Sequence, residues 1–410
     1  CSSREVVRGT HSSKLSLISI LTLAFVGTMA FRISIPAVTF FTRKVLEASA
    51  LNVGLLTSSF FAARAIFSVV AGELADKYGG KVSYAAFLCF LVNGFVVQLY
   101  SIAKSVILII VVRFLQGVLN GISWVSVQFI LGRSVSEEFR GRAYAIYFAS
   151  GSLGIVAGNM TYSILSHNPI GDVLNISTVL FIVSSILALA ITYNSRFETM
   201  VSSVERGREK SGKYEGKLIS IIPLVIVVFN VTFFASMMRG DLIYVYINEF
   251  FGVSEAVVAQ TIAFSSLIAL AGGYMLSWFS DRFSDFSALR ASLLIAYLGG
   301  FLVSVRMFPL AILGLAIFYA ANSGIVPISR KIAVTYYRLG GTALGLVNAL
   351  GNVGAVIGAS VLGYLYDKFD GTALAMPTFE LSVFTLISTL SLALSLIASL
   401  FLRENYKVAN

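Results

Sequence analysis

Residues 51–81 read LNVGLLTSSFFAARAIFSVVAGELADKYGGK. Residues 51–72 are almost all apolar, with Arg64 as the one charged interruption. A helix needs about 20 mostly apolar residues to cross the hydrocarbon core of a bilayer. Residues 73–81 carry acidic and basic side chains, and a second apolar run begins at Val82. This alternation predicts one membrane span, a short charged loop and a second span.

The same alternation recurs along the whole chain. The 410 residues are 57% hydrophobic and 12% charged, a composition far from that of a water-soluble domain. Lipid offers no partner for backbone N–H and C=O groups, so spanning segments must be helical. We therefore predict an all-α membrane protein with twelve transmembrane helices, at 15–41, 51–72, 82–101, 105–131, 141–166, 174–193, 218–247, 255–279, 287–306, 309–329, 340–366 and 379–402.

The basic residues follow the expected membrane topology. A net charge of +10 is compatible with a nucleic-acid partner. With both termini in the cytoplasm, however, most of the 30 Lys and Arg residues lie on the inner side, as the positive-inside rule requires. We therefore expect a multi-pass protein of the cell membrane whose surroundings are lipid, and no nucleic-acid partner.

The longest hydrophilic stretch separates six predicted spans from the other six. It is rich in charge and is typical of an inner linker. The predicted organisation is a cytoplasmic tail, a six-helix bundle, a cytoplasmic linker, a second six-helix bundle and a second cytoplasmic tail, at 1–14, 15–193, 194–217, 218–402 and 403–410 respectively.

An internal repeat relates the two halves. Span five contains seven small residues that recur in span eleven at a constant offset, namely Gly141, Ala143, Ala149, Gly151, Gly154, Val156 and Gly158, matched by Gly341, Ala343, Ala349, Gly351, Gly354, Val356 and Gly358. Glycine at intervals of three and four lets a neighbouring helix approach closely. Both spans are therefore expected at tight helix crossings, and packing alone is a sufficient explanation for the glycines.

The charged loop after span two resembles the signature loop of the major facilitator superfamily. The segment from Gly72 to Lys81 has the family's glycine, aspartate and basic positions, although Gly80 stands where a basic residue is usual. The resemblance implies two six-helix pseudo-repeats, alternating access and a cytoplasmic gate, which here would comprise Gly72, Asp76, Lys77, Gly79 and Lys81, with a degenerate copy at Asp281 and Arg282. A charged loop that only sets topology is the alternative.

Span four carries an arginine motif that resembles the one found in proton-coupled exporters of that family. An arginine in the apolar region costs about 3 kcal/mol or more, so Arg113 is expected to face the bundle interior. Gln116 and Asn120 follow on the same helical face. This stripe either lines a cavity or forms a structural hydrogen-bond network. Ile155 replaces a proline that is usual in span five of exporters, which weakens the case for export.

Four arginines, Arg32, Arg64, Arg113 and Arg239, lie well inside the predicted spans, together with one central acid. Asp241 is therefore the leading candidate for a protonatable coupling site, and Gly240 before it allows local unwinding. Arg239 lies on the opposite side of an ideal helix, and Arg32 lies near Pro36, which is expected to kink or break span one. Asp241 is predicted to pair with Arg32 or Arg113. A fixed salt bridge without a coupling role is the alternative.

The function indicated by these patterns is secondary transport. The chain has neither a phosphate-binding loop for nucleotide hydrolysis nor a catalytic cluster, so we expect no enzyme, no cofactor and no metal site. The hypothesis is alternating-access efflux of a small organic solute by proton antiport, driven by the proton gradient in a monomer. A proton-coupled symporter or facilitator that imports a metabolite, and a receptor without transport activity, are the alternatives.

Overall fold

The computed structural model describes the backbone of residues 2–135, 137–193, 221–336, 340–369, 372–376 and 380–402. Eleven of the described helices are long and apolar enough to cross a membrane. α5, Glu137–Leu165, is a further helix of 29 residues at the position of predicted span five. The predicted all-α membrane class is confirmed. The predicted linker, 194–217, and C-terminal tail, 403–410, lie outside the described residues.

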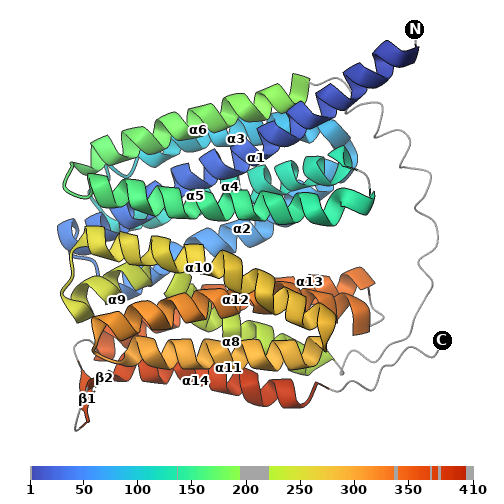
Figure 1. Ribbon diagram of the computed structural model, residues 1–410. Helices are drawn as coiled ribbons and strands as arrows, with labels where there is room; N and C mark the ends of the chain where they lie inside the picture. The colour runs from blue at the N-terminus through green and yellow to red at the C-terminus, as the bar shows by residue number, and fades with distance from the viewer. Residues whose placement is uncertain are drawn as a thin grey trace. The chain divides into compact units, whose positions relative to one another are not determined.

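The first compact unit comprises residues 1–38 and 62–211. Within it α3 packs against both α4 and α6, as Figure 1 shows. Its elements are most of α1 (Ser2–Phe40), the second part of α2 (Ala50–Tyr78), η2 (Gly79–Lys81), α3 (Val82–Gln98), α4 (Val106–Ser134), α5 and α6 (Ile170–Tyr193).

The second compact unit comprises residues 39–61 and 212–410. In this unit α8 packs against α13 and α14, and α12 packs against α10 and α11. Besides the end of α1 and the first part of α2, it holds η1 (Phe41–Val45), α8 (Ile222–Arg239), α9 (Leu242–Phe251), α10 (Glu255–Arg282), α11 (Asp285–Ser304), α12 (Phe308–Tyr336), α13 (Gly340–Phe369), β1 (Ala373–Ala375), β2 (Glu380–Ser382) and α14 (Val383–Leu400).

Serine side chains start four of the helices. The Oγ atoms of Ser105, Ser254, Ser284 and Ser382 accept from backbone N–H groups three residues further on, at 3.3 to 3.5 Å. Such caps satisfy donors that have no partner inside the helix. The last cap explains why α14 begins later than the predicted span, after a two-stranded antiparallel hairpin in which Ala373 pairs with Ser382.

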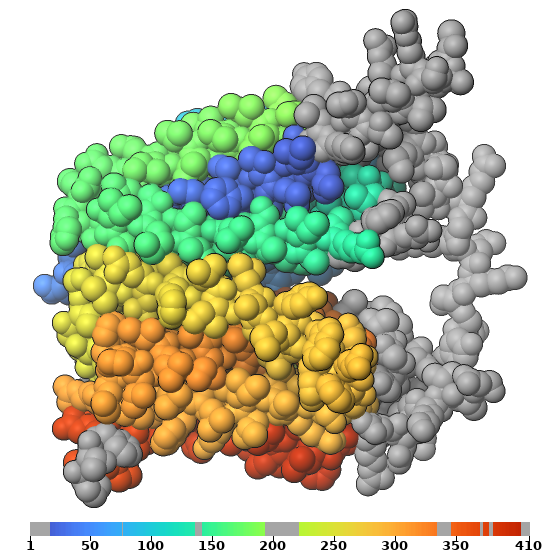
Figure 2. Space-filling view, viewed as in Figure 1, coloured from blue at the N-terminus to red at the C-terminus, as the bar shows by residue number. Residues whose placement is uncertain are grey.

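Many apolar side chains on the described helices are exposed. Figure 2 shows one face of the molecule, with the surface of α6 in light green. On α6 the exposed residues include Val179, Val183 and Ile186, and on α14 they include Leu390, Leu394 and Ile397. The spacing of three and four residues places each set on one helical face. A continuous apolar face of this kind fits contact with lipid, which agrees with the composition.

The repeated glycines of α5 and α13 pack against α1 and α8, respectively. A Cβ atom on Gly154 would clash with the backbone of Phe25 and lie 3.1 Å from Thr28 in α1. A Cβ atom on Gly354 would lie 2.5 Å from both the Phe229 carbonyl oxygen and Thr232 Oγ1 in α8. The predicted tight crossings are therefore present at these glycines. The repeat also aligns α1 with α8.

Predicted span seven is broken in two. α8 ends at Arg239, Gly240 is extended, and α9 starts at Leu242 with Asp241 as its N-cap residue. A Cβ atom on Gly240 would collide with the Ser236 carbonyl oxygen and Thr57, so no larger side chain fits without a shift. Predicted span one behaves differently: α1 continues as a helix through Pro36, so this proline does not break the helix. A kink at Pro36 stays a prediction.

Candidate functional site

Asp241 lies at the break between α8 and α9, where it is 3% exposed. Its Oδ1 atom accepts from the Thr39 hydroxyl at 2.8 Å, and its Oδ2 atom accepts from the Thr57 hydroxyl at 2.7 Å. The Asp241 backbone N–H in turn donates to Thr57 Oγ1 at 2.9 Å. The carboxylate is thus held by hydroxyls from α1 and α2, all within the second unit.

Arg239 precedes the break and lies over an aromatic ring. Its guanidinium carbon is 5.4 Å from the centroid of the Tyr319 ring on α12, within the range of a cation–π interaction. The Tyr319 hydroxyl donates to the carbonyl oxygen of Met238 at 2.6 Å. This bond satisfies one of the carbonyls left without a helical partner where α8 ends.

The span-four stripe forms a buried polar core in the first unit. Arg113 is 1% exposed, Gln116 is 0% exposed and Asn120 is 4% exposed. Gln116 Oε1 accepts from Arg113 Nη1 at 3.4 Å and from the Tyr100 hydroxyl at 2.7 Å. The Arg113 guanidinium also lies 5.7 Å from the centroid of the Phe31 ring on α1. The stripe therefore faces the bundle interior. This agrees with the free-energy cost of placing the Arg113 charge in lipid.

Arg32 lies at a close helix crossing in the same unit. A Cβ atom on Gly158 would lie 2.7 Å from Arg32 Cβ, so α5 approaches α1 closely beside this arginine. Arg32 and Arg113 belong to the first unit, whereas Asp241 belongs to the second. The pairing of Asp241 with either arginine stays a prediction.

A polar network that we call the corner network links the α1–α2 connection to the rest of the second unit. Arg43 donates from Nε to Glu249 Oε1 at 2.6 Å and from Nη2 to Glu249 Oε2 at 3.1 Å. Tyr366 donates its hydroxyl to the same Oε2 at 2.8 Å, and Arg43 Nη1 donates to the Ala48 carbonyl at 2.7 Å. The two-point geometry is the strong form of an arginine–carboxylate pair.

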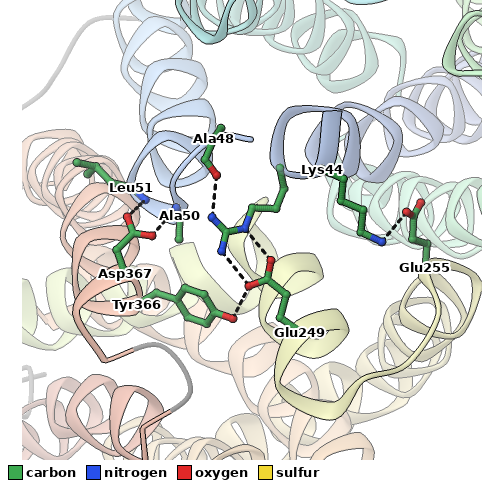
Figure 3. A network of polar contacts seen from close by, with 9 residues as sticks. Lys44, Ala48, Ala50, Leu51, Glu249, Glu255, Tyr366 and Asp367 are labelled. Carbon is green, nitrogen blue, oxygen red and sulfur yellow. Dashed lines mark hydrogen bonds and ion pairs between the residues drawn. The ribbon is translucent and has the colours of Figure 1, made fainter. Parts of the chain in front are cut away.

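The same network caps the first turn of α2. The Asp367 carboxylate accepts from the backbone N–H groups of Ala50 at 2.7 Å and Leu51 at 2.8 Å (Figure 3). Lys44 completes the network with a 2.8 Å ion pair to Glu255. A carboxylate at a helix N-terminus is stabilised by both the orphan N–H groups and the helix dipole.

The loop predicted as a cytoplasmic gate follows α2 directly. Gly79 has a φ of 56°, a left-handed conformation that favours glycine, and it opens the single 3-10 turn before α3. Lys77 is exposed and lies over the Tyr78 ring, and Lys81 is exposed. A Cβ atom on Gly72 would meet no described atom within 4 Å. The Asp76 side chain lies outside the described part, so the gate stays a prediction.

The degenerate copy of this loop forms an ion-pair cluster of its own. Lys331 Nζ on α12 lies 2.7 Å from Asp281 Oδ1 and 2.7 Å from Asp285 Oδ1. Ser280 donates to the same oxygen of Asp285. Arg282, by contrast, is exposed. The structure therefore brings Asp281 together with Lys331, a partner that the sequence pattern did not indicate.

Sequence reasoning missed the partners of the charged side chains. Thr39 and Thr57 carried no signal of their own, because hydroxyl residues are common in membrane helices. The sequence contains a weak signal for the corner network. Its charged residues all flank predicted spans on one side of the membrane, and that side is otherwise poor in basic residues. Only the three-dimensional arrangement shows that Glu249 and Asp367 contact the α1–α2 connection.

Comparisons with known proteins agree with this architecture. The family model of the Major Facilitator Superfamily matches residues 20–359. A probable peptide/nitrate transporter of Arabidopsis thaliana is 29% identical over 150 residues, which are 36% of this chain and 30% of that protein. An MFS-type transporter of Metarhizium rileyi is 27% identical over 161 residues, 38% of this chain and 33% of that protein. The matched segments thus span about a third of the length of each of these two relatives.

Solved structures match over nearly the full length. A bacterial homologue of the human lysosomal transporter Spinster superposes with a TM-score of 0.69 at 14% identity, covering 95% of both chains. The nucleoside transporter NupG, in a mutant form, gives 0.71 at 11% identity, with 94% of this chain and 98% of that chain covered. The human organic anion transporter TETRAN gives 0.66 at 15% identity, with coverages of 95% and 99%. The chain therefore belongs to the Major Facilitator Superfamily, and it is a multi-pass membrane protein.

Proposed function

We propose that this transporter couples solute movement to protons through Asp241 and exports a small organic solute in exchange. The observation that carries the proposal is the position of the Asp241 carboxylate. It is buried at a helix break, and both of its oxygens accept from hydroxyls of the segment 39–61. Broken helices are where transporters commonly bind substrates and coupling ions. We expect a monomer in the cell membrane.

Protonation of Asp241 would change what holds this segment. An ionised carboxylate only accepts hydrogen bonds, whereas a protonated one donates from one oxygen. The protonated oxygen is then a weaker acceptor for the Thr39 or Thr57 hydroxyl, so these contacts weaken or rearrange. The free energy of binding a proton to Asp241 therefore differs between conformations that keep these contacts and conformations that lose them. Such a difference allows protonation to shift the conformational equilibrium.

The direction of transport is supported by the span-four motif. Arg113, Gln116 and Asn120 form a buried stripe of the kind that the sequence resemblance associates with proton-coupled exporters. The second candidate is a proton-coupled importer or a facilitator. It is favoured by Ile155, which stands where exporters usually have a proline. The two candidates predict opposite signs of proton movement, or none for a facilitator.

The test is proton movement in proteoliposomes that contain the full chain and an internal pH dye. A panel of amphipathic cations, sugars and organic anions is added from outside. The wild type should show a solute-dependent pH change whose sign separates antiport from symport. Asp241→Asn keeps the size of the side chain but cannot take up the proton, so the pH change should be lost.

The matched control is Asp172→Asn, which removes an exposed acid in the first turn of α6. This variant should retain the pH change. Solute flux without proton movement in the wild type, or full coupling in Asp241→Asn, would reject the coupling role of Asp241.

A further inference from the structure

Arginine dominates the charges inside the described spans. Arg32, Arg64, Arg113 and Arg239 all lie within membrane helices, against Asp241 as the one acid of their central region in the described chain. The Asp241 oxygens accept from two threonine hydroxyls. A charge at this depth costs about 3 kcal/mol or more unless an opposite charge or polar partners compensate it. In formal charge, the central parts of the described spans are therefore more positive than negative.

Arg239 ends α8, directly before the break in span seven. It is half-buried, and its guanidinium carbon lies 5.4 Å from the centroid of the Tyr319 ring. The bond from the Tyr319 hydroxyl to the Met238 carbonyl fixes the ring in place. A guanidinium stacked on a ring can still bond a carboxylate or phosphate through the edges of its planar fork.

Asn322 adds a buried side-chain amide whose oxygen accepts no hydrogen bond from the described residues. It follows Tyr319 by three residues on α12 and therefore lies on the same helical face. The side chain is 3% exposed, and its Oδ1 atom is buried without a hydrogen-bond partner among the described residues. Leaving such an atom unpaired is costly, so a buried amide of this kind calls for a partner that the protein does not supply.

We propose that Arg239, Tyr319 and Asn322 form the subsite that binds an anionic group of the transported solute. Arg239 supplies the charge and two parallel N–H donors, while the Tyr319 ring sets the plane of the guanidinium. Asn322 bonds to a hydroxyl or amide donor next to the anionic group. The solute is accordingly an organic anion with a neighbouring hydrogen-bond donor. This inference rests on the proposed function, because it assigns a substrate class to the same transporter.

The position of the subsite suits coupling. Arg239 and Asp241 flank the extended Gly240, so the subsite and the carboxylate share one helix break. A change in the backbone at Gly240 would move both side chains. Binding of an anion at Arg239 and protonation of Asp241 therefore act on the same structural element, the α8–α9 junction.

The experiment measures ligand-induced thermal stabilisation of the purified full chain, at fixed pH and without a gradient. The probes are matched sets that share one apolar frame: phenylacetate, phenethyl alcohol and phenethylamine, then hexanoate, hexanol and hexylamine, with mandelate and phenyl phosphate as further anions. A ligand that binds the folded state raises the unfolding temperature according to its affinity. Anions should stabilise the wild type, and their neutral and cationic counterparts should not.

Two variants and a control identify the residues. Arg239→Gln should weaken anion binding by about tenfold or more, as expected for a charged hydrogen bond. Asn322→Asp keeps the shape of the amide but adds a negative charge to the subsite, so it should also weaken anion binding. Arg306→Gln removes a half-exposed arginine that pairs with Glu380, and it should leave the anion response unchanged.

The outcomes separate this inference from the proposed coupling. Stabilisation by the cationic probes, no stabilisation by any of the anions, or an anion response that Arg239→Gln leaves intact would each overturn the anionic subsite. Proton movement in proteoliposomes is measured separately on the wild type. A transporter that moves protons with neutral or cationic solutes would retain the proposed coupling and lose this subsite.

Discussion

At the scale of single residues, the proposed function of this chain depends on polar side chains that the apolar helices bury. Asp241 is stabilised by Thr39 and Thr57 without a basic residue in those two contacts. Gln116 plays a comparable part in the first unit, where its Oε1 atom accepts from both Arg113 and Tyr100. In these contacts a hydroxyl or an amide oxygen supplies part of the hydrogen bonding that a buried charged group needs.

Thr57→Val tests the support of Asp241 directly. Valine has the shape of threonine but lacks the hydroxyl, which here both donates to Oδ2 and accepts from the Asp241 backbone N–H. Removing it leaves buried polar atoms unpaired, at a cost of about 1–3 kcal/mol. The midpoint of thermal unfolding in detergent should therefore fall.

The control for that variant is Thr261→Val. Thr261 is also buried, but among the described residues its hydroxyl bonds to the Val257 carbonyl of its own helix alone. This carbonyl keeps its helical partner, so the loss should be smaller. Equal unfolding midpoints for the two variants would show that Thr57 does not support Asp241.

At the scale of elements, the glycines of α5 and α13 determine which helices can pack closely against each other. Gly154 contacts Phe25 and Thr28, and Gly354 contacts their repeat partners Phe229 and Thr232. By the same alignment Pro36 of α1 corresponds to Gly240, the residue at the break in span seven. The two equivalent positions have different outcomes: the helix continues through the proline, whereas the glycine opens into an extended residue.

Gly354→Ala should destabilise the second unit. The new methyl group would lie 2.5 Å from the Phe229 carbonyl oxygen and Thr232 Oγ1, so α13 and α8 would have to separate. Overpacking of this kind costs about 1–3 kcal/mol. Thermal unfolding in detergent measures the loss, and solute flux in proteoliposomes should fall with it.

Gly72→Ala is the matched control for helix packing. No described atom lies within 4 Å of its added methyl group, and alanine is the better helix former by about 1 kcal/mol. Its unfolding midpoint should equal or exceed that of the wild type. A drop as large as that of Gly354→Ala would mean that the glycines act through the backbone rather than through packing.

At the scale of the whole molecule, the distribution of basic residues predicts which side of the membrane each loop faces. The corner network is on the side assigned to the outside, and the ion-pair cluster of Lys331 is on the side assigned to the cytoplasm. This orientation rests on the positive-inside rule and not on the family membership, so it stays a prediction.

Single-cysteine labelling in intact cells tests the orientation. Cys89 is buried, and Cys1 can be replaced by serine, so an introduced cysteine reports its own side. Val45→Cys, at a residue that is 64% exposed, should react with a membrane-impermeant maleimide from outside. Phe283→Cys, at a residue that is 66% exposed, should react only after permeabilisation. The reverse pattern would invert the topology.

The sequence by itself determined that the chain lies in lipid, that it is helical, that its halves are repeats and which family it belongs to. Each of these conclusions follows from local patterns in the sequence. Apolar runs of membrane length demand helices, and glycine spacing on one helix demands close packing. The positions of the spans also followed from composition, apart from the break at Gly240, where glycine allowed unwinding but did not require it.

Only the tertiary structure decided which polar groups meet. Asp241 was identifiable as a buried acid, but its contacts with Thr39 and Thr57 join residues about 200 and 180 positions apart. The same holds for Glu249 with Arg43 and for Asp367 with the start of α2. The physical reason is that a hydrogen bond depends on the distance between two atoms in space, and the packing of several helices sets that distance.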